Sequence, residues 1–186
     1  MALAQRTLSA MDRTQPATAV VVRITVPPAL ARLRRAWDRD ARAGIPTHVT
    51  ILFPFVEPRD LGRSVRDELA GIAAAHEPFD VRFERVGRFP GVLYLAPLPA
   101  DPFRRLTSGV TARFPGFPPY GGAYDEVIPH LTIAEADDDG ALDEVAVLVS
   151  RQLPFSARVA ELEVLVESGE GRWHRRWRLP LGQRPE

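Results

Sequence analysis

The tripeptide His-apolar-Thr occurs twice in this chain, each time inside a run that is typical of a buried β-strand. One copy is His-Val-Thr at 48–50 and the other is His-Leu-Thr at 130–132. Residues two apart in a strand point to the same face, so each copy places an imidazole beside a hydroxyl. Two such strands facing each other would form a pocket with two proton-transfer groups and two neutral hydrogen-bond donors. The alternative interpretation is a pair of half-buried strand histidines, with threonine as an ordinary strand former.

Composition limits the classes of protein that remain. The chain has 186 residues, no cysteine and a net charge of zero. This excludes disulfides, thiolate metal sites and cysteine nucleophiles, and bulk charge does not indicate a nucleic-acid partner. No apolar stretch approaches the roughly 18 residues that span a bilayer. The first 17 residues contain Arg6, Asp12 and Arg13 without an apolar core, which predicts a loose tail and a cytoplasmic protein.

Hydrophobic periodicity gives the order of the remaining elements. The two motif runs are strands, and a Pro/Gly/Tyr-rich loop at 115–124 leads into the second motif. Helices are expected at 29–43, 60–76, 102–114 and 139–152, and further strands at 19–26, 79–89, 92–96, 155–167 and 172–180.

Each half of the chain therefore has the order strand, helix, motif strand, helix, strand. This duplication predicts an α+β fold of two pseudo-twofold-related lobes, each an antiparallel-rich sheet with helices outside, and a cleft between them. The predicted bilobal domain covers 18–181, between an N-terminal tail at 1–17 and a short tail at 182–186. A cleft between lobes is a favoured place for a ligand.

Paired in this way, the motifs resemble those of the 2H phosphoesterase superfamily, in its branch of 2′-5′ RNA ligases and 2′,3′-cyclic phosphodiesterases. The resemblance covers residues 19–181 and includes a proline shortly before each motif, Pro46 and Pro129. It implies that His48 and His130 are the catalytic acid and base. It also implies that Thr50 and Thr132 hold the substrate phosphate.

The implied activity is metal-independent hydrolysis of a 2′,3′-cyclic phosphate or a 2′-5′ phosphodiester bond. One neutral histidine would take a proton from water, and one protonated histidine would give a proton to the leaving oxygen. Threonine hydroxyls would donate hydrogen bonds to the phosphate as charge develops. Which histidine is the base stays open at this point.

The expected partner is a nucleotide or an RNA end carrying a cyclic phosphate, bound by a monomer without a cofactor, DNA or a membrane. Relatives that act on RNA often carry a basic residue soon after the second motif, whereas here residues 133–139 contain Glu135 and Asp137 to Asp139 and no basic residue. That difference favours a small nucleotide or a capped end. The alternatives are an RNA 2′-5′ end-joining ligase, an enzyme that cleaves another cyclic nucleotide, a non-catalytic RNA or nucleotide binder, and a metalloprotein. For the last, acidic residues 137–139 are available, but their place before a helix suits an N-cap better.

Weaker candidates lie elsewhere. Tyr120 and Tyr124 belong to the loop before the second motif, where they could stack on a base or bind a phosphate. Phe53 follows the first motif and is a further candidate for base contact. The cation-rich C-terminal strand instead predicts a charge ladder with its hairpin partner. In that ladder Arg172, His174, Arg176 and Arg178 oppose Glu167, Leu165, Glu163 and Glu161.

Overall fold

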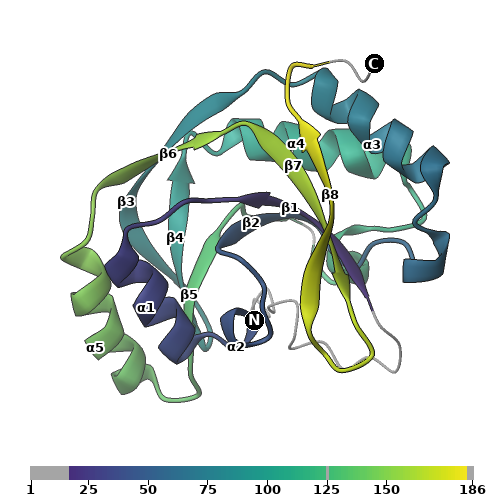
Figure 1. Ribbon diagram of the computed structural model, residues 1–186. Coiled ribbons are helices and arrows are strands. Elements are labelled where there is room, and N and C mark those ends of the chain that lie inside the picture. The colour runs from purple at the N-terminus through teal and green to yellow at the C-terminus, as the bar shows by residue number, and fades with distance from the viewer. Residues whose placement is uncertain (1–16, 125, 184–186) are drawn as a thin grey trace.

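Two four-stranded antiparallel sheets form the framework of residues 17–124 and 126–183, which the computed structural model describes. One sheet has the order β2-β1-β7-β8 and the other β5-β4-β3-β6 (Figure 1). The strands of the first sheet are β1 (Thr18–Arg23), β2 (His48–Leu52), β7 (Glu161–Glu167) and β8 (Trp173–Pro180). Those of the second are β3 (Phe79–Phe89), β4 (Val92–Leu98), β5 (Leu131–Glu135) and β6 (Phe155–Val159).

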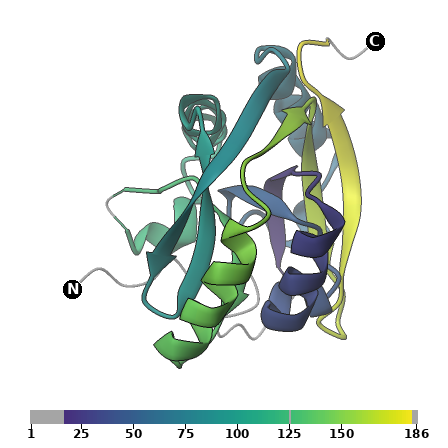
Figure 2. The same ribbon diagram turned by 90° about the vertical axis from the view of Figure 1, so that its left-hand side faces the viewer.

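The helices pack in two pairs outside these sheets. α1 (Pro28–Trp37) lies beside α5 (Asp139–Ser150), and α3 (Arg63–Ala74) lies beside α4 (Asp101–Arg113). Figure 2 shows the first pair at the front, with the sheets behind it. The short helix α2 (Arg39–Arg42) and the 3₁₀ turns η2 (Pro58–Asp60) and η3 (Pro119–Gly122) complete the described elements.

The predicted twofold arrangement is confirmed. β2 and β5, which carry or adjoin the two motifs, are edge strands of different sheets and contact each other. Helices from one half reach the motif strand of the other, because α1 packs against β5 and α4 packs against β2. The α+β fold with two lobes is therefore the architecture of the protein, and it brings the two motif strands together at its centre.

The faces of the first sheet carry different side chains. Val20 and Val22 of β1 point into the main core, while Val21 points the other way into a smaller apolar cluster with Phe53 and Trp173. Register decides which face the first motif occupies. His48 pairs with Arg23, and Thr50 pairs with Val21. Since directly paired residues share a face, both motif side chains lie on the side of Val21 and Arg23.

The single helix predicted at 29–43 is wrong, because the helix breaks at Asp38. Asp38 has extended dihedral angles (φ −115°, ψ 124°), and its carboxylate accepts a hydrogen bond from the Asp40 N–H at the start of α2. Its Oδ2 lies 2.7 Å from Nε of Arg34, an ion pair whose angle falls short of a hydrogen bond. Both side chains are buried, at 4% and 0% exposure. An N-cap and a buried ion pair thus outweigh the apolar periodicity that favoured one long helix.

The single strand predicted at 155–167 is also wrong. The chain turns at Ala160, and the two parts join different sheets as β6 and β7. β6 is an edge strand with alternating exposure, whereas β7 is central and almost continuously buried. No glycine or proline marks the turn, so only this change of pattern distinguishes the two strands.

The C-terminal charge ladder forms in a different register from the predicted one. An irregularity between Val164 and Leu165 shifts the pairing, so Glu163 lies opposite Arg178. The ion pairs that form are Arg178 with Glu161, at 2.8 Å, and Arg175 with Glu163, at 3.3 Å. A bulge of this kind moves the following side chains to the other face, which sequence alternation does not reveal.

The predicted tail at 1–17 lies outside the described residues except for Ala17, and the tail at 182–186 does so beyond residue 183. Among the described helices, none combines the length and the apolar character that crossing a bilayer requires.

The ion pair between Arg34 and Asp38 should dominate local stability. We expect Arg34→Met to lower the free energy of unfolding by about 3–5 kcal/mol, because it leaves a buried carboxylate without its partner. Urea denaturation at pH 7 measures this change. Arg32→Met, at an exposed position of the same helix, should change it by less than about 0.5 kcal/mol. The double variant Arg34→Met/Asp38→Asn should recover most of the loss; equal instability of the single and double variants would contradict this account.

Candidate active site

The two motif histidines are buried where the two edge strands meet. His48 begins β2 and His130 immediately precedes β5. Their exposed fractions are only 8% and 7%. The charge of His130 lowers the pKa of His48, so the two rings are close enough to interact. The structure therefore brings together the two motifs that the sequence places half a chain apart.

Both imidazoles are held by the same local hydrogen bond. Nδ1 of His48 lies 2.8 Å from the carbonyl oxygen of Pro46, and Nδ1 of His130 lies 2.7 Å from that of Ile128. A carbonyl can only accept, so Nδ1 must carry the hydrogen in each ring. The proton-exchanging nitrogen is then Nε2 in both residues, and the fixed bond determines the tautomer and the ring orientation.

The surroundings of the two histidines differ electrostatically. Burial lowers the pKa of His48 to about 3, helped by the positive charge of Arg34. Burial also lowers the pKa of His130, while the bond to the Ile128 carbonyl opposes the shift. Both rings are therefore neutral at pH 7. Because the unfolded chain binds protons more readily, these groups make the fold less stable as pH falls from 6.5 towards 3.

The two motif threonines are partly exposed, unlike the histidines. Thr50 hydrogen-bonds the hydroxyl of Tyr120, a buried residue of η3. Among the described residues, Tyr120 is the one non-glycine residue with a positive φ, at 52°. Its N–H donates to the carbonyl of Phe53. Such backbone strain persists only where surrounding contacts hold it. The loop before the second motif thus reaches back to the first.

An aromatic pair surrounds the second histidine, and sequence reasoning missed it. Phe89 and Tyr94 stack with ring centroids 4.3 Å apart, and they meet His130 edge-on at 5.1 and 5.6 Å. Tyr94 lies directly opposite Thr132 across the β4–β5 ladder. Gly87 makes room for it, since a Cβ at that position would collide with the tyrosine ring. A lone tyrosine in the apolar run of 92–95 is the only signal that the sequence offers.

Arginines adjoin the first histidine, and they too were missed as site residues. Arg23 is the cross-strand partner of His48, and Arg34 is close enough to act on its pKa. The guanidinium of Arg34 also donates to the carbonyl of Ile45, just before the first motif. Neither position is evident from sequence, because each depends on a pairing or packing across the fold.

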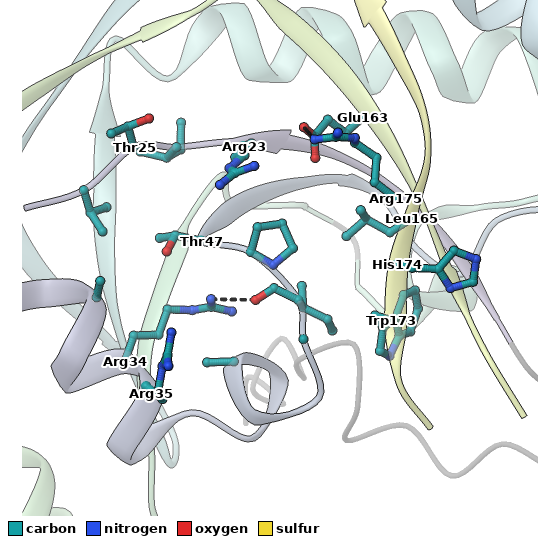
Figure 3. A pocket seen from close by; sticks show the side chains of 17 residues that line it. Arg23, Thr25, Arg34, Arg35, Thr47, Glu163, Leu165, Trp173, His174 and Arg175 are labelled. Carbon is teal, nitrogen blue, oxygen red and sulfur yellow. Dashed lines mark hydrogen bonds and ion pairs between the residues drawn. The ribbon is translucent and has the colours of Figure 1, made fainter. Parts of the chain in front are cut away.

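A cavity of about 540 Å³ opens beside the first motif (Figure 3). Its walls come from the end of β1, from α1, from the segment that leads into β2, and from β7 and β8. Pro46 and Thr47 belong to the lining, but the two histidines do not. The cavity is thus adjacent to the histidine pair and separate from it.

The weaker candidates have different placements. Tyr124 is half-buried and packs edge-on against Tyr120, with ring centroids 5.4 Å apart. Phe53 is completely buried against Trp173, so its ring has no surface for a base and its role is packing. Asp138 caps α5 by accepting from the Gly140 N–H, as the acidic run predicts. Within 17–124 and 126–183, no three His, Cys, Asp or Glu residues gather as a metal site would require.

Comparison with known proteins agrees with this arrangement. The family model described as the 2′-5′ RNA ligase superfamily matches residues 15–171. A search of curated proteins found no match. Among solved structures, Escherichia coli LigT complexed with NADP⁺ covers 91% of this chain and 100% of its own, with a TM-score of 0.54 at 16% identity.

Two further structures show the same fold. TT0787 of Thermus thermophilus has a TM-score of 0.56 at 18% identity, covering 89% of this chain and 98% of its own. A structure described only as a phosphoesterase has a TM-score of 0.54 at 16% identity, covering 90% and 99%. The family model covers most of the chain, and the chain therefore belongs to the 2′-5′ RNA ligase superfamily of 2H phosphoesterases.

Proposed function

We propose that this protein is a metal-independent phosphodiesterase that hydrolyses 2′,3′-cyclic phosphates or 2′-5′ phosphodiester bonds with His48 and His130 as its base and acid. The observation that carries the proposal is that both imidazole rings make the same hydrogen bond to the backbone. Each holds Nδ1 on a carbonyl oxygen, at 2.8 and 2.7 Å, which leaves Nε2 for proton transfer. The two buried imidazoles make the same hydrogen bond and lie on strands that contact each other. This arrangement suits a reaction in which one group takes a proton and another gives one.

The positive charge beside it favours His48 as the base in hydrolysis. Its pKa of about 3 keeps Nε2 unprotonated across the neutral range, next to the positive charge of Arg34. No arginine contributes to the lowering of the His130 pKa, which burial causes. A bound phosphate anion would favour the protonated form of His130 and so prepare it as the acid.

In the proposed step, one histidine takes a proton and the other gives one. Nε2 of His48 takes a proton from water as the water oxygen bonds to phosphorus. The bond from phosphorus to the ribose O3′ breaks, and Nε2–H of His130 gives that oxygen its proton, leaving a 2′-phosphate. Thr50 and Thr132 donate to the non-bridging oxygens as charge develops there. Tyr120 acts on the substrate indirectly, by holding the hydroxyl of Thr50.

Relatives support a nucleotide as the substrate class. LigT has been crystallised with NADP⁺ and with 3′-AMP. We extend nucleotide binding to this chain, with a nucleotide or RNA end carrying a cyclic phosphate as the substrate. The aromatic rings of Phe89 and Tyr94 beside His130 offer flat apolar surface near the reacting phosphate.

An assay of the purified protein tests this function. The panel is 2′,3′-cyclic nucleotides, 2′-5′ oligoadenylate and RNA with a cyclic-phosphate end, each with and without EDTA. We expect hydrolysis that EDTA leaves unchanged, because histidines supply both proton transfers. Activity that EDTA abolishes and a divalent ion restores would favour the metalloprotein alternative instead.

Substitution of the motif residues separates catalysis from binding. His48→Ala and His130→Ala should each lower kcat by several powers of ten, and the double variant should lose little more, because the two groups act as a unit. Thr50→Val and Thr132→Val should cost about 10- to 1,000-fold, as expected for one lost donor. Arg176→Ala, on an exposed face of β8, is the matched control and should keep its turnover. Full activity of both histidine variants would refute the assignment.

The dependence of kcat/KM on pH follows from the lowered pKa values. As pH falls through about 3, His48 gains a proton and ceases to be a base. As pH rises through the lowered pKa of His130, the free enzyme loses its acid. The profile should therefore be bell-shaped, with both limbs below the ordinary histidine value of about 6.5. Arg34→Met should move the acidic limb to higher pH. An alkaline limb above about 7 would show that burial does not govern His130.

A further inference from the structure

The cavity beside the first motif is rich in arginine. Arg23, Arg34, Arg35 and Arg175 line it, whereas Glu163 is the one acidic residue of its lining. Figure 3 shows Arg23 pointing in from β1 and Arg34 and Arg35 from α1. This concentration of positive charge stands in a chain whose net charge is zero. The volume of about 540 Å³ is within the range of small-molecule sites.

Two of these arginines form ion pairs, and the other two do not. Arg34 pairs with Asp38 at 2.7 Å, and Arg175 pairs with Glu163 at 3.3 Å. Among the described residues, Arg23 and Arg35 make no ion pair or hydrogen bond. Both are exposed, so their guanidinium groups are accessible to a solute. Burial raises the pKa of Glu163 and the charge of Arg23 lowers it, whereas the charge of Arg35 is left for a ligand. A guanidinium fork matches the oxygens of a phosphate group.

The cavity also has a fixed position relative to the reacting phosphate. Arg23 is paired with His48 across the β1–β2 ladder, and Thr47 of the lining directly precedes it. A group held in the cavity would thus belong to the part of the substrate next to the scissile phosphate. The hydroxyls of Thr25 and Thr47 add neutral donors to the same walls.

We propose that this cavity binds a second phosphate of the substrate, attached to the nucleoside that bears the cyclic phosphate. The inference rests on the proposed function and narrows its substrate class. The preferred substrate is a 5′-phosphorylated nucleotide or an RNA end, in which the 5′-phosphate occupies the arginine cavity. A simple cyclic mononucleoside phosphate leaves the cavity empty and binds more weakly.

Two substrates that differ by one group test the proposal. They are 2′,3′-cyclic AMP and the same compound with a 5′-phosphate. The wild-type protein should show the lower KM for the 5′-phosphorylated compound. Arg35→Gln should raise that KM about tenfold or more, the effect of losing one charged hydrogen bond. The kcat of Arg35→Gln for this compound should change little, because a contact equal in the ground and transition states affects KM alone.

The KM for 2′,3′-cyclic AMP should stay unchanged in Arg35→Gln. Arg32→Gln is the matched control, since this neighbour on α1 lines a different groove, with Leu33 and Leu148. It should behave as wild type with both substrates. Equal losses on the two substrates in Arg35→Gln, or no loss on either, would overturn the proposal.

A binding measurement separates this inference from the proposed catalytic function. Inorganic pyrophosphate is titrated calorimetrically into the wild-type, Arg35→Gln and Arg32→Gln proteins. Weaker binding in Arg35→Gln alone supports the cavity even if no substrate is turned over. Identical binding in all three overturns it even if hydrolysis of cyclic phosphates is demonstrated, because the pyrophosphate then binds elsewhere.

Discussion

The buried ion pair between Arg34 and Asp38 connects the path of the chain to the state of the first histidine. Asp38 ends one helix and caps the next, while Arg34 also holds the carbonyl of Ile45 at 2.9 Å. Pro46 follows, and its carbonyl fixes the ring of His48. Burial raises the pKa of Asp38 to about 7, against the pull of Arg34, so the pair is held at a cost in desolvation. What this arrangement provides is a positive charge at a set place beside a neutral imidazole.

The two halves of this fold hold their motif histidines in the same local geometry but surround them with different side chains. Both histidines use Nδ1 in the same way, and both motifs sit where an edge strand of one sheet meets that of the other. Around His48 the neighbours are arginines, and around His130 they are the rings of Phe89 and Tyr94. A duplicated scaffold can therefore place two identical groups in different electrostatic surroundings, the kind of asymmetry by which an acid and a base are distinguished.

Local patterns in the sequence predicted the elements well, and the strand at 79–89 has the predicted bounds. The lobes and the meeting of the motif strands also followed, because a duplicated order of elements restricts the topology. What could not be predicted depends on distant partners. The break at Asp38 needs Arg34, the pairing of Arg23 with His48 needs the sheet register, and the position of Tyr120 needs Thr50. The roles of the four motif residues and of the tyrosines stay predictions, whereas Phe53 is a packing residue.

Because β2 and β5 contact each other, β8 and β6 are the outer edges of the two sheets. An open edge is a template on which another chain can add a strand, and charged side chains discourage that addition. β8 carries Arg175, Arg176 and Arg178 at exposed positions, and β6 carries Arg158. The cationic C-terminal strand thus presents an edge of the kind that disfavours the addition of another strand.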